Sequence, residues 1–168
     1  MLRETFELES AERFIAAMGM AATSVTVVTT NGEAGRFGLT VSAFSSVSAE
    51  PPMVLVCVNR KSPASAAIEA NGLFAVNVLA AEARPVAETF AGRPKSGRPF
   101  DFSEHDWHDG RHGQPVLAEA TAIFECALEN AFDAGTHRIF LGRVGSARRG
   151  EAAPLVYCNR GFRRIAAY

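Results

Sequence analysis

The sequence predicts a mainly β fold, namely a closed barrel of mostly antiparallel strands with a few short helices on its outside. Three observations predict it. Roughly seven runs of strand length stand against two or three short helical segments. The runs follow one another at hairpin-like spacing, without regular alternation of strand and helix. With 168 residues, of which 48% are hydrophobic and 21% charged, the chain has the length and composition of one globular domain, residues 1–168.

The first element is a short amphipathic helix. Ser10 is its expected N-cap, Phe14 and Met18 lie on one side of it, and it ends near residues 19–22. Residues 23–30 are rich in β-branched side chains and are expected to form a strand, since these side chains favour sheets. The strand ends at Asn31-Gly32, a strong signal for a short hairpin turn.

The next strands are expected at 39–47, where apolar and hydroxyl side chains alternate, and at 53–58, with Pro51-Pro52 between them. A helix then begins with Ser62 as N-cap and Pro63 at the first position, and it ends at Asn71-Gly72.

In the second half of the chain, residues 73–79 are predicted as a strand and 82–90 as a weak helix, because Pro85 restricts it. Residues 91–113 are rich in Gly, Pro, Asp and His and are predicted to form a long loop, a feature that is often functional. The remaining strands are expected at 121–128, 137–144 and 155–158, with 161–165 as a candidate last strand.

Composition excludes several classes of protein. Seventeen basic and eighteen acidic side chains give a net charge of −1. The chain therefore has no long-range positive electrostatic field that would attract a nucleic-acid backbone, and non-specific nucleic-acid binding is not expected. Cys57, Cys126 and Cys158 form no metal or redox motif, and an odd count of thiols indicates a reducing, cytoplasmic setting. Residues 1–10 are acidic where a signal peptide is basic and apolar, and no apolar run reaches about 18 residues, so neither export nor a membrane span is expected.

Common catalytic motifs are absent from the sequence. It contains no GxGxxG after a strand, no GxxxxGK[ST], no GxSxG and no HExxH. A nicotinamide cofactor would therefore not be held by a Rossmann unit.

Two segments suggest a ligand site. The strand at 39–47 and the residue after it carry small hydroxyl groups at Thr40, Ser42, Ser45, Ser46 and Ser48. These are typical of a half-solvated strand, but they also leave room for a flat polar ligand. Asn59, Arg60 and Lys61 precede a helix N-terminus, which indicates either a phosphate site or a capped helix with solvated charges.

Several fragments, taken in order, resemble the flavin reductase-like family of FMN-binding split barrels. The matching fragments cover nearly the whole chain and are residues 38–48, 51–52, 56–62, 74–79, 90–92, 113–117, 136–144 and 154–157. The resemblance implies a homodimeric, six-stranded split barrel with Greek-key topology that binds FMN or FAD near the dimer interface.

The resemblance also implies positions for the flavin. The isoalloxazine ring is expected along Thr40, Val41, Ser42 and Ala43, with Ser45 and Ser46 nearby. The ribityl phosphate is expected near Asn59, Lys61 and Ser62, with Cys57 and Val58 also among the cofactor-binding residues. A second flavin-facing segment is expected at Phe90, Ala91 and Arg93.

His137 has two interpretations. Within an apolar run, a histidine is commonly satisfied by a cross-strand partner. The resemblance instead places it beside the nicotinamide, where it would orient NADH or NADPH. Thr136 precedes it where many family members carry Asp, so the local charge differs.

The implied activity is that of an NAD(P)H-dependent flavin reductase. Hydride passes from nicotinamide C4 to flavin N5, and reduced flavin then diffuses to the oxygenase component of a two-component monooxygenase. An alternative on the same fold is an FMN-dependent reductase of a corrinoid or ferric acceptor. An alternative of another class is a non-enzymatic flavin- or haem-binding sensor.

Two further clusters are given structural interpretations. His105, His108 and His112 lie in the predicted loop, and they could bind one metal ion together only if they stood on one face of a helix. Asp109-Gly110 disfavours a helix there, so no metal site is predicted. Trp107 is instead expected to cap a solvated loop. The arginines at 148–149 and 160–164 are interpreted as a solvated face that could also meet the adenylate end of a dinucleotide.

Overall fold

The structure is a computed structural model that describes residues 7–167. Part of the acidic segment at 1–10 therefore lies outside the described residues, and that residues 1–168 form a single domain stays a prediction. The elements are, in order, α1 (Ala11–Met18), β1 (Thr23–Ser24), β2 (Thr26–Thr30), β3 (Phe37–Val41), β4 (Phe44–Ala49), β5 (Pro52–Asn59), α2 (Pro63–Asn71), β6 (Leu73–Val78), α3 (Arg84–Phe90), a 3-10 helix (Phe102–Glu104), β7 (Trp107–Asp109), β8 (Pro115–Leu117), β9 (Ala122–Ala134), β10 (His137–Arg149), β11 (Leu155–Cys158) and β12 (Gly161–Arg164).

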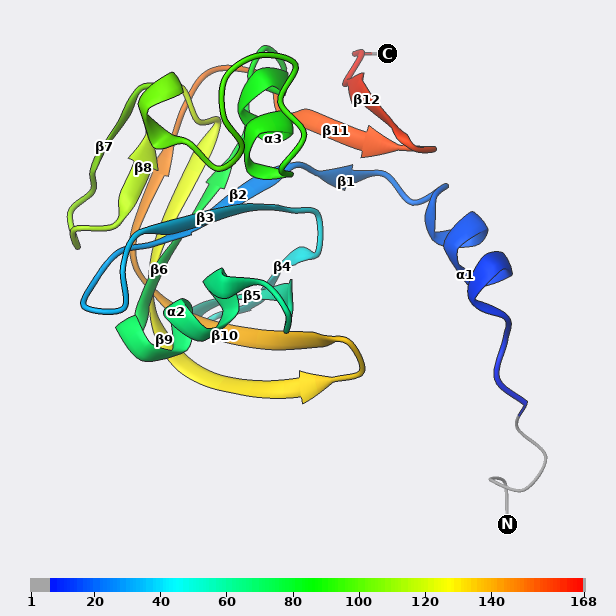
Figure 1. The fold of residues 1–168 in the computed structure, drawn as a ribbon, viewed down its shortest axis with the longest axis horizontal. Coiled ribbons are helices and arrows are strands. Elements are labelled where there is room, and N and C mark those ends of the chain that lie inside the picture. The colour runs from blue at the N-terminus through cyan, green and yellow to red at the C-terminus, as the bar shows by residue number, and fades with distance from the viewer. Residues whose placement is uncertain (1–6, 168) are drawn as a thin grey trace.

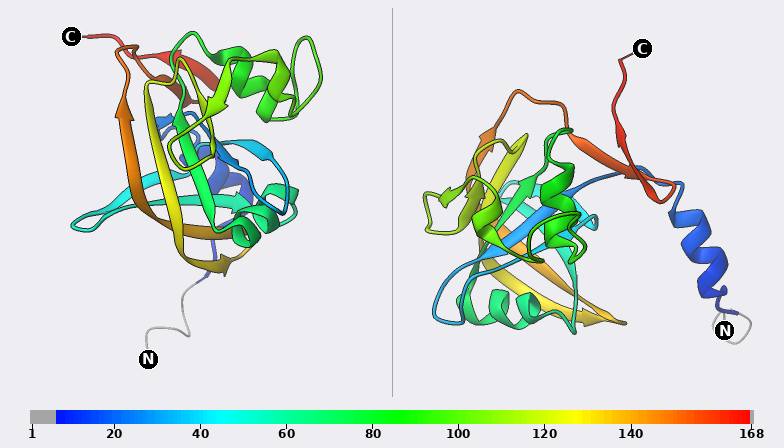
Figure 2. Two further views of the ribbon diagram at one scale, coloured as in Figure 1. Left: turned by 90° about the vertical axis from the view of Figure 1, so that its left-hand side faces the viewer. Right: turned by 45° about the horizontal axis from the view of Figure 1, so that its top comes forward.

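A seven-stranded antiparallel sheet forms the body of the molecule, in the order β3-β2-β6-β9-β10-β5-β4. Figures 1 and 2 show this sheet curling into a barrel, with α2 at one end and α3 at the other. After β2, β3 and the β4–β5 hairpin, the chain crosses through α2 and returns with β6 beside β2, which is a Greek-key connection. The predicted mainly β fold with Greek-key topology and short peripheral helices is confirmed.

The strand predicted at 39–47 is in fact two strands. β3 and β4 lie at opposite edges of the sheet, and only Ser42 and Ala43 join them. The Phe44 N–H donates to the Ser42 carbonyl and the Cys57 N–H donates to the Ala43 carbonyl, each at 3.0 Å. This turn, which we call the Ser42–Ala43 corner, redirects the chain from one edge to the other and so closes the barrel.

The strand predicted at 23–30 is likewise divided, because its first residues belong to another sheet. β1 pairs with β11, whereas β2 pairs with β3 and β6. Val25 lies between the two sheets and is bonded on both sides, to Leu155 and to Leu79. The hairpin predicted at Asn31-Gly32 is confirmed, because β2 pairs with β3 directly after it, but the connection spans 31–36 and is longer than a two-residue turn.

Part of the predicted loop at 91–113 is ordered by packing. β7 pairs with β8, and the Trp107 ring lies 5.3 Å from both Phe90 and Phe102, edge to face. Trp107 is therefore a partly buried core residue rather than a cap on solvated chain. α3 begins at Arg84 with Pro85 in its first turn, a position that proline favours, so Pro85 starts the helix instead of weakening it.

The core has two parts, which the central strands separate. Valines of several strands, Ile68 of α2, and Phe74 and Phe140 form the barrel interior. A second cluster lies under α3 and includes Phe90, Leu79 and Leu117. β2 is buried at every position because both clusters cover it.

Two elements project from this core. β9 and β10 are 13 residues each and extend beyond the predicted 121–128 and 137–144, because their outer halves are exposed and lack the apolar pattern. α1 agrees with the prediction and has the Ser10 side chain as its N-cap acceptor, but none of its residues is buried, and it stands away from the barrel (Figures 1 and 2).

Candidate functional site

The predicted site residues fall into groups around the Ser42–Ala43 corner. On one side lies a cavity of about 550 Å³ between β3, α3 and the β11–β12 hairpin. Four predicted residues line it, namely Thr40, Ser42, Ala91 and Arg93. The Thr40 hydroxyl donates to the Ala87 carbonyl at 2.7 Å, which ties β3 to α3 and fixes one wall of the cavity.

The corner itself presents main-chain donors. Ser42 and Ala43 are exposed, and within residues 7–167 their N–H groups donate to no main-chain oxygen. Ser42 also borders the cavity. Two free amides beside a cavity can donate to the carbonyl and ring nitrogen acceptors of a planar heterocycle.

Cationic and aromatic residues that were not predicted as ligands complete the cavity. Arg84, Tyr157, Arg160, Phe162 and Arg163 line it together with Glu88. The arginines near the C-terminus were interpreted mainly as a solvated face, because sequence alone does not place β12 beside α3. The Asn-Arg-Gly sequence between two short apolar runs is the signal of a hairpin that could have indicated a common face.

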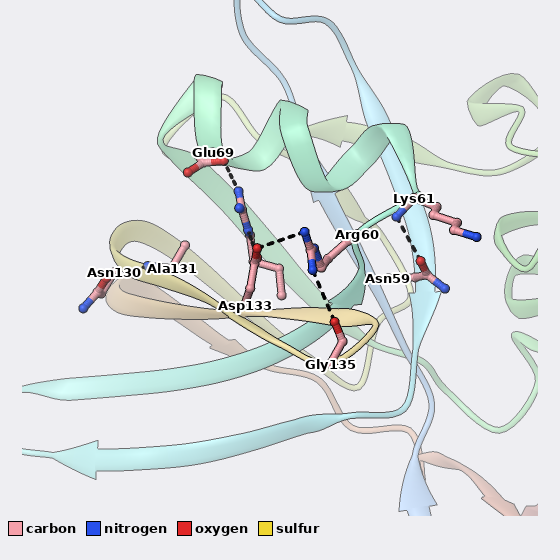
Figure 3. A network of polar contacts seen from close by, with 9 residues as sticks. Asn59, Arg60, Lys61, Glu69, Asn130, Ala131, Asp133 and Gly135 are labelled. Atoms are coloured by element: carbon pink, nitrogen blue, oxygen red, sulfur yellow. Dashed lines mark hydrogen bonds and ion pairs between the residues drawn. The ribbon is translucent and has the colours of Figure 1, made fainter. Parts of the chain in front are cut away.

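A second group lies where β5 and β10 end. His137 is directly opposite Asn59 in their pairing. The Asn59 side-chain oxygen accepts a bond from the Lys61 N–H at 2.9 Å, and Figure 3 shows the Lys61 side chain extending away from the network. Thr136 Oγ1 lies 2.9 Å from His137 Nδ1, so a hydroxyl holds this ring nitrogen.

Ion pairs fix the turn that carries His137. Asp133 binds Arg138 at 2.7 Å and Arg60 at 3.2 Å, Arg138 also pairs with Glu69 of α2, and Arg60 reaches the Gly135 carbonyl (Figure 3). The hydrogen bond from Arg138 holds the pKa of Asp133 below its usual range, so the carboxylate stays charged. We call Asp133, Arg138, Arg60 and Glu69 the Asp133 clamp; it ties the β9–β10 turn to α2 and to the end of β5.

Other predicted residues can meet a ligand only through the main chain. Val41, Val58 and Phe90 have side chains in the core and are at most 6% exposed. Cys57 is half-buried, and burial raises the pKa of its thiol, so the thiol stays protonated. Ser45 and Ser46 are exposed on β4, with no contact to the cavity.

Ser62 is separate from the first cavity. It lines a second one of about 280 Å³ with Arg36, Phe100 and Phe102. Ser62 is the N-cap residue of α2 as predicted, although its side chain makes no cap bond, and Pro63 and the left-handed Gly72 begin and end the helix as predicted.

The histidines of residues 101–112 have separate partners. His105 contacts the Thr89 hydroxyl at 3.1 Å, and His108 pairs with Asp106 at 3.6 Å. Within the described residues, no group of three or more His, Cys, Asp or Glu side chains is arranged to hold a metal ion. Over the same residues, no helix has the length and apolar character needed to cross a membrane.

The chain is similar to a large group of known proteins. The family model described as "Flavin reductase like domain" matches residues 18–166. A relative from Ancylobacter novellus, named FMN reductase (NADH) RutF, is 38% identical over 159 residues, covering 94% of this chain and 86% of the relative. The reductase component of 4-hydroxyphenylacetate 3-monooxygenase from Pseudomonas aeruginosa is 37% identical over 92% of this chain and 91% of its own.

Solved structures agree in fold and sequence. BorF, titled the flavin reductase component of a bacterial two-component tryptophan halogenase, has a TM-score of 0.84 and 37% identity, with 95% of this chain and 100% of that chain covered. A Streptomyces globisporus NADH:FAD oxidoreductase, titled as a complex with NAD and FAD fragments, has a TM-score of 0.84 and 35% identity, with 96% and 98% covered. An oxidoreductase from Sinorhizobium meliloti is longer, and the chain covers 53% of it.

Proposed function

The chain belongs to the flavin reductase-like family, and on this basis we propose that it is an NAD(P)H:flavin oxidoreductase that transfers hydride from reduced nicotinamide to FMN or FAD. Reduced flavin is then supplied to a separate monooxygenase. Relatives named as reductase components of monooxygenase and halogenase systems support this role. NADH is the favoured donor, because relatives are named for it.

The observation that carries the proposal is the pair of free N–H groups at the Ser42–Ala43 corner, beside a cationic cavity. Four arginines and one glutamate line that cavity, although the whole chain has a net charge of −1. Small residues, Ala43 and Ala91, leave the corner and the α3 end open. A flat ring with hydrogen-bond acceptors matches the two free N–H groups, so the residues at the corner fit the ring of a flavin.

Each group of residues then has a task. A bound flavin supplies the redox chemistry. Ser42 and Ala43 donate main-chain hydrogen bonds to its ring edge, where negative charge develops on reduction. Lys61, which forms no ion pair within the described residues, meets the phosphate together with Asn59 and Ser62. His137 orients the nicotinamide.

The test is anaerobic oxidation of NADH and of NADPH by the purified protein, with and without FMN or FAD, followed at the flavin absorbance band. Bleaching that depends on added flavin is the expected result, and it also shows both cofactor preferences. Bleaching of retained flavin without turnover of added flavin would indicate another terminal acceptor. No bleaching, in protein shown to bind flavin, would reject the reductase activity.

The proposal includes a homodimer in the cytoplasm. α1 exposes Phe14, Ile15 and Met18 by 51–59%, an apolar face that a second copy of the chain would cover. The three cysteines are free thiols, as a reducing compartment favours.

A further inference from the structure

The β11–β12 hairpin lies at the end of the first cavity, beside α3 (Figure 1). Tyr157 and Phe162 are directly opposite each other in the pairing, with ring centroids 5.6 Å apart. Arg84 of α3 lies over the Phe162 ring at 5.3 Å. The hairpin therefore joins an aromatic surface to the wall of the cavity that carries the Ser42–Ala43 corner.

The turn of this hairpin has an unfavourable residue. Asn159 and Arg160 form a two-residue loop, with φ of 48° and 57°. Such turns favour Asn followed by Gly, because a Cβ in the left-handed region crowds the backbone. The chain instead has Arg160 in this strained position, and Arg160 lines the cavity.

The arginines around the cavity differ in their partners. Arg84 pairs with Glu88, and the neighbouring Arg164 pairs with Glu82, each at 2.7 Å. Arg93, Arg160 and Arg163 all line the cavity, and among residues 7–167 none of them has a carboxylate within ion-pair distance. Three cations thus face the cavity without an ion-pair partner among the described residues, while Glu88, which also lines the cavity, pairs with Arg84.

Gly161 makes room for one of these cations. The Arg163 guanidinium lies over Gly161, where a Cβ would collide with it, and it donates to the Phe162 carbonyl at 2.9 Å. The Arg163 guanidinium is therefore folded back against the hairpin, although the residue itself is exposed.

Unpaired guanidinium groups beside the exposed ring of Tyr157 and the half-buried ring of Phe162 match one chemical group. Arginine binds phosphate oxygens through paired donors, and an aromatic face can stack on a purine. We propose that the β11–β12 hairpin, with Arg93, binds the ADP moiety of a dinucleotide. This rests on the proposed function, because FAD and NAD(P)H, which share that moiety, are substrates of the proposed reaction.

Titration of ADP itself into the purified protein tests the site. Arg160→Gly removes the guanidinium and relieves the turn, so we expect an equal or higher melting temperature and a Kd for ADP weaker by roughly ten- to hundredfold, the range of one charge-assisted hydrogen bond. Arg163→Gln is a second variant outside the turn, with the same expected direction. Arg149→Ala, an arginine of β10 that does not line the cavity, is the matched charge control and should leave the Kd unchanged.

Comparing each dinucleotide with the corresponding mononucleotide shows whether the bound ADP moiety belongs to FAD or to NADH. A loss of affinity that is larger for FAD than for FMN places the flavin's ADP on the hairpin. A loss that is larger for NADH than for reduced nicotinamide mononucleotide places the dinucleotide donor there. An ADP affinity that is unchanged in both Arg160→Gly and Arg163→Gln, or lowered equally by Arg149→Ala, overturns the inference. Failure of the wild-type protein to reduce FMN rejects the proposed function, while the ADP titration still decides the hairpin site.

Discussion

Asn59 and His137 occupy one register position in the antiparallel pairing of β5 with β10. The residue that we assign to the flavin phosphate and the one that we assign to the nicotinamide are therefore cross-strand neighbours. Because Thr136 Oγ1 contacts His137 Nδ1, the other ring nitrogen is left to meet a ligand.

Replacing His137 should affect the nicotinamide more than the flavin. In His137→Ala we expect the KM for NADH to rise by about tenfold, the effect of about 1.4 kcal/mol of lost binding, with a smaller change in kcat. Flavin affinity should stay the same. Steady-state kinetics with a flavin titration measure all three quantities, and wild-type values for both KM and kcat would refute the role of His137.

The Asp133 clamp should act on the same step from a distance. Asp133→Asn keeps the shape of the side chain but removes the charge that pairs with Arg138 and Arg60. We expect the KM for NADH to rise several-fold as the His137 turn loosens, in kinetics run beside the wild type. Glu129→Gln breaks the pair of Glu129 with Arg143 on the same hairpin, outside the clamp. Equal effects of the two variants would show that the clamp has no special role.

His105 should make stability depend on pH. Burial lowers the pKa of its imidazole below the usual 6.5, so the folded state favours the neutral ring. The unfolded state then binds more protons, and stability falls as pH decreases from about 6.5 towards the lowered folded-state pKa. In His105→Asn the slope of unfolding free energy against pH below about pH 6.5 should decrease. A slope identical to that of the wild type in urea titrations would exclude this cause.

The aromatic cluster under α3 should contribute strongly to stability. Phe90 is 1% exposed and lies 4.9 Å from Phe102 and 5.3 Å from Trp107. Phe90→Ala should lower the free energy of unfolding by about 3–5 kcal/mol, the range for a large-to-small change in a core. Phe132, which is 47% exposed, is the control, and Phe132→Ala should cost less than about 1 kcal/mol. Urea denaturation of both variants measures the two losses of unfolding free energy, and equal losses would contradict the prediction.

The apolar face of α1 should determine the oligomeric state. Phe14→Glu with Ile15→Glu places two charges on that face, so we expect a dimer to become a monomer. Light scattering after size exclusion measures the mass directly. A wild-type mass of 17.9 kDa, that of one chain, would contradict the homodimer.

The sequence predicted those parts of the fold that depend on local chemistry. The Ser10 cap, Pro63 with Gly72, and the strands at 155–158 and 161–165 were all predictable from short-range signals. The division of the predicted strand at Ser42–Ala43 was not predictable. The alternation of apolar and hydroxyl side chains continues through the corner, whereas the strands that provide the hydrogen-bond partners change there. The end of β9 at 129–134 was missed because ion pairs such as Asp133–Arg138, instead of buried apolar side chains, stabilise it. The end of β10 at 145–149 was missed because it is mostly exposed and has no apolar pattern.

The candidate site was predictable only in part, for the same reason. Thr40, Ser42, Ala91 and Arg93 do line one cavity, although they come from distant parts of the chain. Arg160 and Arg163 join them through the placement of a short hairpin, which no local pattern specifies. Phe90 shows the converse, since a residue next to the site in sequence has its side chain in the core.

The Ser42–Ala43 corner has a mechanical consequence. Two residues alone connect the outermost strands of the sheet, so those strands cannot separate without unfolding β3 or β4. The separation of these two strand ends is thus set by the three peptide units between Val41 and Phe44 and exists before any ligand arrives. A binding surface on such a short connection loses little conformational entropy when a complex forms. A weakly bound, exchangeable substrate can therefore still be held in one defined orientation each time it binds.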